Sequence, residues 1–344
     1  MELIDNKKRI EWLDITKGFC MFFIISAHSG FVPSYLDYFY NSFFLSAYFI
    51  LSGYLFHNPE RNPEVFKKLT KIVESLLVPY LVYWALSYTV DSLLRGNYNI
   101  LPNLFWDIVS GKKLWFMSCL IVSEIVFALY ISFFRKTLSI VVFIFLSFLV
   151  WYFLKDYKLP WAVGISFMAN VFLAFGYLLR IHNDAFLKFL NNDRIGIGLI
   201  FAWVGLFIAQ CFLEYRISFP ANDFGNLFFY FPYVIVGSFA VFYLSTKWKR
   251  HTRLALFLGQ NSLLYYFFQG QVLKLMKSIF VKFGFTNPDY FKPLLIALLV
   301  SLILILPILL VKRYFPIMAG KIPFLSTKFG SFSHLYKKIQ ITKK

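Results

Sequence analysis

Charged residues are scarce in this sequence. Only 15% of the 344 residues are Asp, Glu, Lys or Arg, whereas 59% are hydrophobic and 22% are aromatic, and the mean hydropathy is +0.64. A soluble domain of this length does not have such a composition. Because apolar runs of about 20 residues recur along the chain, the sequence predicts a protein that crosses the membrane several times.

Cysteine is also rare. Cys20, Cys119 and Cys211 each lie in an apolar run, and none has the spacing of a metal ligand. Free cysteines of this kind pack as small hydrophobic residues. We therefore expect no disulfide and no metal site. The sequence also shows no convincing internal repeat, no low-complexity linker and no soluble terminal domain.

Acidic residues are half as frequent as basic ones, 17 against 35, which gives a formal net charge of +18. In a membrane protein an excess of Lys and Arg marks cytoplasmic loops rather than a nucleic-acid surface. We therefore expect membrane lipids, and no nucleic acid, as partners. The first apolar run lacks a convincing small-residue cleavage site, so we expect it to stay as a helix and not to be removed as a signal peptide.

Ten apolar segments are candidate membrane spans. They lie at about 17–31, 40–56, 73–94, 114–134, 138–154, 160–180, 195–214, 225–245, 255–280 and 293–311. With the N-terminus in the cytoplasm, 25 of the 35 Lys and Arg residues fall on the cytoplasmic side. The sequence thus predicts an all-α polytopic integral membrane protein with about ten transmembrane helices and both termini cytoplasmic. We expect residues 1–311 to form the membrane domain and residues 312–344 to form a basic cytoplasmic tail that lies on anionic lipid.

The segment at 10–31 carries a lysine and a histidine that a helix would place on one face. Lys17 and His28 are eleven residues apart, which is about three turns and roughly 16 Å along the axis. An ionisable side chain within a membrane is costly and therefore indicates function. The alternative is a histidine that a neighbouring helix satisfies and that serves only in packing. From the residues alone, the two interpretations are equally favoured.

Two further groups of polar residues accompany apolar segments. Lys67, Lys68 and Lys71 cluster at the entrance of the third segment, where their charges suit the phosphates of a nucleotide-like donor or only mark the cytoplasmic side. Glu124 lies near the middle of the fourth segment, where a carboxyl needs a partner or a proton. It would orient His28, line the path of an acceptor, or form a structural hydrogen bond.

Together these motifs resemble the membrane acyltransferase-3 family, the polytopic O-acyltransferases of bacterial surface glycans that include fucose 4-O-acetylase-like members. The family's first helix carries a basic residue, ten residues of any kind and a histidine, as Lys17 and His28 do here. Further motifs follow in the family's order and cover nearly the whole chain: Ser52-Gly53-Tyr54-Leu55, Lys68 and Lys71 before Pro79-Tyr80, Leu114-Trp115-Phe116, Gly176-Tyr177 before Arg180, and Gly259 to Tyr266.

The sequence departs from the family's pattern at several positions. Lys68 and Lys71 replace the commoner arginines, so a bidentate grip on phosphate is not expected. Phe44 and Gln269 stand where many members have a histidine. The departure at Phe44 weakens any mechanism that uses two histidines, and we assign no acid–base role to Gln269.

The resemblance implies transfer of an acyl group, most often acetyl, from cytosolic acetyl-CoA to a hydroxyl of a cell-surface or lipid-linked glycan, at the inner (plasma) membrane of a bacterium. The base or acyl relay would be His28, with Glu124 as a second catalytic candidate. The residues expected to bind or position the donor are Lys17, Lys68, Lys71, Asp14 and Trp115. For Asp14, capping of the first helix is an equally good interpretation.

Two other classes of function stay open. A polysaccharide exporter or flippase would show internal repeats and several charges within the membrane, and the sequence shows no repeat. A non-catalytic subunit of a glycan-assembly complex would keep the motifs without activity. The presence of both Lys17 and His28 argues mildly against that subunit.

Overall fold

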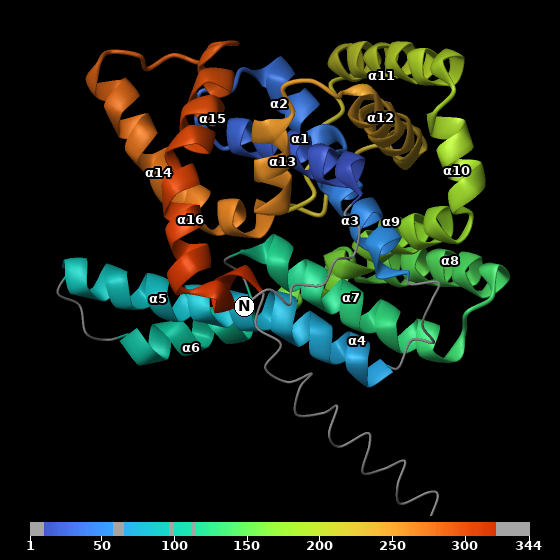
Figure 1. Cartoon of the computed structure of the whole chain (residues 1–344), viewed down its shortest axis with the longest axis horizontal. Coiled ribbons are helices and arrows are strands. Elements are labelled where there is room, and N and C mark those ends of the chain that lie inside the picture. The colour runs from blue at the N-terminus through green and yellow to red at the C-terminus, as the bar shows by residue number, and fades with distance from the viewer. Residues whose placement is uncertain (1–9, 58–64, 96–99, 112–113, 321–344) are drawn as a thin grey trace, which may run out of the picture. The chain divides into compact units, whose positions relative to one another are not determined.

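The computed structural model of the chain describes residues 10–57, 65–95, 100–111 and 114–320 (Figure 1). Within these residues helices form nearly all of the secondary structure, and the only β pairing is an isolated bridge between Ser218 and Asp223. The prediction of an all-α protein is therefore confirmed. The chain forms two compact units, one of residues 1–51 and 182–305 and the other of residues 52–181 and 306–344.

The first unit is built around its N-terminal helix. Its helices are α1 (Glu11–Ala27), α2 (Ser34–Ser42), the first half of α3 (Phe44–Phe56), α10 (Asn183–Leu190), α11 (Asp193–Leu213), α12 (Leu227–Lys247), α13 (Arg253–Gln260), α14 (Ser262–Lys282) and α15 (Lys292–Ile303). Helix α1 packs against α12, α13, α14 and α15, and it lies most closely against α13 (Figure 1).

The second unit begins within α3. Its helices are α4 (Val65–Ile72), a π-helical turn (Val73–Leu77), α5 (Val78–Arg95), α6 (Ile100–Ser110), α7 (Trp115–Phe133), α8 (Thr137–Leu154), a 3-10 turn (Pro160–Ala162), α9 (Val163–Ile181), α16 (Ile305–Tyr314, entering this unit at 306) and a second 3-10 turn (Pro316–Ala319). Helices α7, α8 and α9 share a core of aromatic and aliphatic side chains that includes Phe127, Phe143 and Tyr177.

Glycine allows α1 and α13 to approach at backbone distance. A Cβ on Gly18 would overlap the carbonyl of Ala255, and a Cβ on Gly259 would overlap the carbonyl of Asp14. Small residues let two helices in a membrane pack this closely. The same device holds the end of α3 against α9 in the second unit, where a Cβ on Gly53 would overlap the carbonyl of Leu173. These contacts fix the helices that carry the candidate residues described below.

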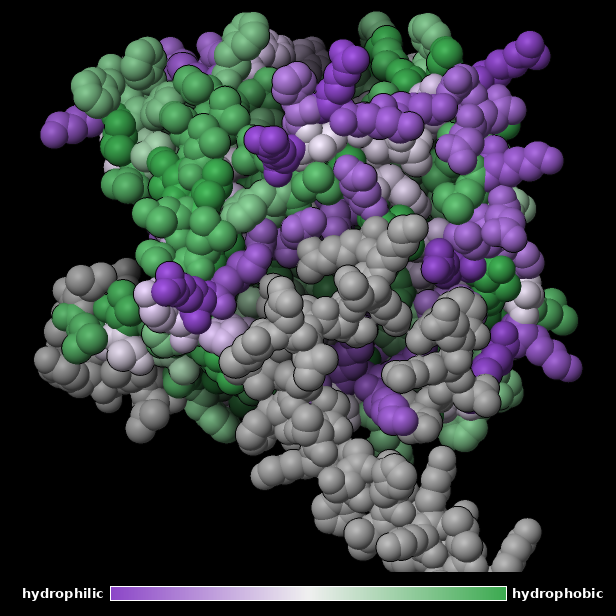
Figure 2. All heavy atoms as spheres, in the orientation of Figure 1, coloured by the Kyte–Doolittle hydropathy of each residue, from purple (hydrophilic) through white to green (hydrophobic). Residues whose placement is uncertain are grey.

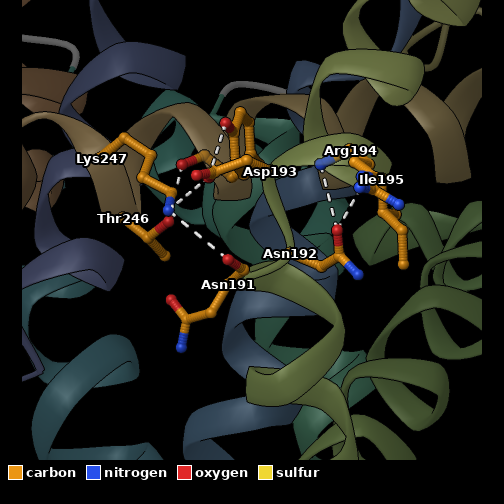
Figure 3. Close-up of polar contacts among 8 residues, drawn as sticks. Asn191, Asn192, Asp193, Arg194, Ile195, Thr246 and Lys247 are labelled. Atoms are coloured by element: carbon orange, nitrogen blue, oxygen red, sulfur yellow. Dashed lines mark hydrogen bonds and ion pairs between the residues drawn. The ribbon is translucent and has the colours of Figure 1, made fainter.

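An ion pair joins the C-terminus of α12 to the N-terminus of α11 (Figure 3). The ammonium of Lys247 lies 2.5 Å from the carboxylate of Asp193, and the side chain of Asn192 caps α11 by accepting hydrogen bonds from the backbone N–H groups of Arg194 and Ile195. A cation at a helix C-terminus and an anion at a helix N-terminus both complement the helix dipoles. The pair therefore favours the packing of the two helix ends against each other.

Seven helical segments of the described residues are long and apolar enough to cross a membrane. They are Val65–Val90, Trp115–Phe133, Thr137–Leu154, Pro160–Ile181, Asp193–Leu213, Leu227–Lys247 and Lys292–Tyr314. Figure 2 shows an apolar surface over α14 and α15, at the upper left. The exposed residues of α15 include Leu294, Leu295, Leu298 and Leu302. Exposed leucines in such numbers suit contact with lipid chains. The protein is a polytopic membrane protein.

The seven segments match seven of the ten that the sequence predicts, to within a few residues except at the start of the third. The other three differ: α1 has 17 residues, α3 has 13, and the segment at 255–280 is two helices that meet at Asn261. Helices α2, α6 and α10, of 9, 11 and 8 residues, were not predicted. The total of ten spans and the cytoplasmic termini stay predictions. Most of the basic tail, from residue 321 onward, lies outside the described residues.

Candidate functional site

The first group of candidate residues lies on α1. Glu11 and Asp14 stand in its first turn, where negative charge is favourable. Asp14 does not cap the helix, because the N-cap is Ile10 without a side-chain hydrogen bond. The carboxylate of Asp14 lies 4.0 Å from the ammonium of Lys17, one turn further on, and both side chains are mostly buried. This favours the interpretation in which Asp14 positions Lys17.

Lys17 stands where α1 is held most firmly. The hydroxyl of Tyr48, on α3, donates a hydrogen bond of 2.7 Å to the backbone carbonyl of Lys17, and the next residue is Gly18, which packs on α13. These contacts fix the backbone from which the lysine side chain extends.

His28 is not inside the helix, as the sequence suggested, but ends it. Helix α1 stops at Ala27, and His28 is its C-cap with an exposed side chain. The expectation of a histidine inside the helix is therefore wrong, whereas its depth in the membrane stays a prediction. The physical reason lies in the next residues: Gly30 has φ +83°, which turns the chain out of the helix, and the carbonyl of Phe31 accepts a hydrogen bond from the backbone N–H of Asp289.

The hydrogen bond of the His28 ring determines what its two nitrogens can do. Nδ1 lies 2.7 Å from the carbonyl oxygen of Ile24. A carbonyl only accepts hydrogen bonds, so the proton of the neutral imidazole is on Nδ1 and Nε2 carries the lone pair. An exposed side chain with Nε2 unprotonated is able to take a proton from a hydroxyl.

The second group of candidate residues lies in the second unit, where the end of α3 meets α4. The ammonium of Lys68 donates a hydrogen bond of 3.1 Å to the carbonyl of Phe56 and lies 4.1 Å from the centre of the Phe56 ring. Lys71 is exposed one turn further along α4. The two lysines therefore do share one helix face, and Lys68 is anchored to the end of α3.

Glu124 is held by the Ser-Gly motif of α3. The hydroxyl of Ser52 donates a hydrogen bond of 2.5 Å to Oε1 of Glu124, and the negative charge of Glu124 also attracts Lys68. Ser52 and Lys68 both belong to the second unit. This contact supports the structural interpretation of Glu124, and its catalytic role stays a prediction.

Three basic residues that were not among the predicted donor-binding residues lie close to Lys68. The guanidinium of Arg180, at the end of α9, donates a hydrogen bond of 3.1 Å to the hydroxyl of Tyr54. His57 follows α3, and its charged form is repelled by Lys68 and Arg180. Arg135 follows α7 and, with Lys71, repels Lys68. We call these residues the basic cluster: His57, Lys68, Lys71, Arg135 and Arg180.

The fold makes the basic cluster because three helix ends meet there. Arg135 and Arg180 are separated by 45 positions in the sequence, yet α7 and α9 pack side by side and end together. The only sequence signal was that the expected topology assigns both arginines to the cytoplasmic side. That signal says on which side they lie, but not that they meet.

Trp115 does not join the basic cluster. It is the first residue of α7, whereas Arg135 follows the last turn of the same helix. A helix of 19 residues is about 28 Å long. Trp115 therefore lies at the opposite end of α7 from the lysines with which the sequence analysis had grouped it.

His57 titrates abnormally. Burial lowers the pKa of its imidazole below the ordinary value of 6.5, and the charges of Lys68 and Arg180 lower it further. The unfolded chain therefore takes up the proton first as the pH falls. The free energy of unfolding should decrease as the pH falls from 6.5 through the lowered pKa of the folded state.

We expect His57→Gln to lose less thermal stability than the wild type between pH 7.5 and pH 5.5, because glutamine does not titrate. The unfolding temperature of the purified protein in detergent, measured at both values of pH, checks this. His182→Gln is the matched control at an exposed histidine and should follow the wild type. If the wild type and His57→Gln lose the same thermal stability between the two values of pH, the pKa of His57 is not lowered in the folded protein.

Comparison with known proteins gives one result. A family profile described as an acyltransferase domain matches residues 10–312. No curated protein and no solved structure matches the chain. The match covers almost all of the described residues and both groups of candidate residues. The chain belongs to the membrane acyltransferase-3 family, and it is a membrane acyltransferase.

Proposed function

We propose that the protein transfers an acetyl group from cytosolic acetyl-CoA to a hydroxyl of a cell-surface or lipid-linked glycan, at the inner membrane of a bacterium. Membership in the family supports acyl transfer in general. The observation that carries the finer proposal is the hydrogen bond from Nδ1 of His28 to Ile24, which leaves the lone pair on Nε2 of an exposed residue at the end of α1.

In this proposal His28 is a general base. Its Nε2 takes the proton of the glycan hydroxyl as the oxygen attacks the thioester carbonyl. The carbon–sulfur bond then breaks, and the thiolate of CoA leaves with that proton. The Ile24 carbonyl stabilises the imidazolium that forms in between, because it keeps its hydrogen bond to Nδ1–H. A covalent acetyl-histidine relay through the same Nε2 is the alternative.

The basic cluster would hold the phosphates of the donor. Four cationic side chains within one group of helix ends offer point charges and two guanidinium forks to a polyanion. Arg180 is held by Tyr54 and Lys68 by Phe56, so little side-chain freedom is lost when phosphate binds. A contact of Lys17 with the donor, with Asp14 as its positioning partner, stays a prediction.

The proposal is tested by measuring transfer of the acetyl group to a glycan. Purified protein in liposomes, supplied with acetyl-CoA labelled in its acetyl group and with glycans extracted from bacterial membranes, should label the glycan in a bond that mild alkali cleaves, as expected of an O-ester. Mass spectrometry of the same glycans should show an added acetyl group. Label found only on lipid, on protein or in free acetate would overturn the proposed acceptor.

Replacing Lys68 and Lys71 together with glutamine should weaken the binding of CoA by about 1–3 kcal/mol, the range of charge-assisted contacts. The measurement is the affinity for CoA of the purified variant, accompanied by its unfolding temperature. Lys136→Gln removes an exposed charge near the same helix ends and is the matched control. If the double variant binds CoA as the wild type does, the two lysines only mark the cytoplasmic side.

A further inference from the structure

One lysine from α14 and one from α15 lie near the end of α1 that carries His28. In the structure, the Cδ and Nζ atoms of Lys277, on α14, lie 3.1 Å from the position that a Cβ would take on Gly30. Two features therefore favour glycine at position 30: its φ of +83° and the space that the Lys277 side chain occupies. The ammonium of Lys277 is thereby placed against the backbone two residues after His28.

A second lysine lies near this turn, at Phe31. The ammonium of Lys292, at the start of α15, lies 6.0 Å from the centre of the Phe31 ring and donates a hydrogen bond of 2.9 Å to the carbonyl of Asn287. The Phe31 side chain is buried, and the backbone N–H of Asp289 donates to its carbonyl. The loop between α14 and α15 is thus fastened to the end of α1. In the chain, Lys277 precedes this loop and Lys292 follows it.

The carboxyl of Asp289 lies near Lys292 and attracts its charge. Asp289 accepts hydrogen bonds from the backbone N–H groups of Phe291, at 2.7 Å, and Lys292, and these bonds lower the pKa of its carboxyl. Asp37, on α2, accepts from the side chain of Asn41 at 2.8 Å. Among the described residues Lys277 is exposed and has neither a hydrogen bond nor an ion pair. Its charge is therefore available to a ligand.

The position of these lysines runs against the usual charge pattern of membrane proteins. Ser262 and Lys17 both contact Tyr48, whereas Lys277 contacts Gly30, so α14 runs beside α1 from the Lys17 end to the His28 end. In the expected orientation the His28 end faces away from the cytoplasm, where Lys and Arg are normally few. Four lysines nevertheless lie in this part of the chain: Lys274, Lys277, Lys282 and Lys292. Topology does not explain them.

We propose that Lys277, supported by Lys292, binds an anionic group of the acceptor saccharide, a carboxylate or a phosphate, and so holds the acceptor beside His28. This inference rests on the proposed function, because it specifies the acceptor of the same reaction. A cation beside the base selects an acceptor that carries a negative charge close to the reacting hydroxyl. The stem and the ammonium of Lys277 both lie against Gly30, and the residue as a whole is exposed.

The test measures binding without the donor, so its outcome does not depend on acyl transfer. The probes are three sugars that differ only at carbon 6: galactose, galacturonic acid and galactose 6-phosphate. The protein is placed in nanodiscs of phosphatidylcholine, and binding is followed by ligand-detected NMR. The wild type should bind at least one of the anionic sugars more tightly than galactose, and added salt should weaken that preference.

Lys277→Gln should lower the affinity for the preferred anionic sugar about five- to tenfold, as expected for one charge-assisted contact in a partly exposed site. Lys277→Arg should keep most of the affinity. Lys282→Gln removes an exposed lysine from the end of the same helix and should leave binding unchanged. Equal effects of Lys277→Gln and Lys282→Gln, or no preference for either anionic sugar, would overturn the proposal.

Two further outcomes separate this inference from its alternatives. If nanodiscs that contain phosphatidylglycerol abolish the binding of the anionic sugars at Lys277, the lysine binds a lipid headgroup and the acceptor assignment is wrong. If the binding pattern holds while the labelled acetyl group reaches no glycan, the anion site stands and the proposed acyl transfer to a glycan fails.

Discussion

Replacement of His28 by alanine should abolish acylation of the glycan while leaving the protein folded. A base that takes part in proton transfer contributes about 10²- to 10⁴-fold in rate, and in the proposed function His28 is this base, with the lone pair on Nε2. Because the side chain is exposed at the C-cap of α1, its removal leaves no cavity in the core. Expression, unfolding temperature and affinity for CoA should therefore stay near those of the wild type.

The variants His28→Asn and His28→Gln decide between chemistry and structure. Either amide can donate a hydrogen bond to the Ile24 carbonyl, but neither can carry a proton from hydroxyl to leaving group. Both should be as inactive as alanine, and His182→Ala should be as active as the wild type. If His28→Gln keeps a substantial fraction of the transfer rate, His28 is structural. An exporter or a non-catalytic subunit predicts no labelled glycan from any variant or from the wild type.

Replacement of Gly18 by alanine should strongly destabilise the first unit. The added Cβ would overlap the backbone carbonyl of Ala255, which cannot rotate away as a side chain does. Excess volume in a packed interface typically costs about 1–3 kcal/mol, and we expect the upper end of that range or more. The helices α1 and α13 would have to separate, and Gly259 opposite Asp14 would lose its fit at the same time.

Thermal unfolding in detergent and the yield of folded protein measure this effect. Gly205→Ala is the matched control, because a Cβ at Gly205, within α11, meets nothing within 4 Å. It should be neutral or slightly stabilising, since alanine is the better helix former. If Gly18→Ala is as stable as Gly205→Ala, the close approach of α1 and α13 is not as the structure places it.

The sequence predicted the class of the protein and most of its long helices. The segments at 138–154 and 160–180 agree with the observed spans to within a residue at each end. Hydropathy predicts these spans because the free energy of transfer into a membrane is summed along a local run of side chains. The sequence failed where a segment is short or polar, as for α2, α6 and the break at Asn261. There the packing of neighbouring helices, and not hydropathy, decides where a helix begins and ends.

For the candidate site, the sequence predicted His28, Lys68 and Lys71 as functional residues, because residue type and spacing along one helix are local properties, and their roles stay predictions. It placed His28 inside the helix, since the turn at Gly30 depends on the contacts with Lys277 and Asp289 far along the chain. It separated Arg135 and Arg180 from the lysines, and it grouped Trp115 with them. Only the packing of α7 against α9 brings the two arginines together, and only the length of α7 keeps Trp115 away. Charges that meet through tertiary packing leave no periodic trace in the sequence, so the tertiary structure alone decided the composition of the basic cluster.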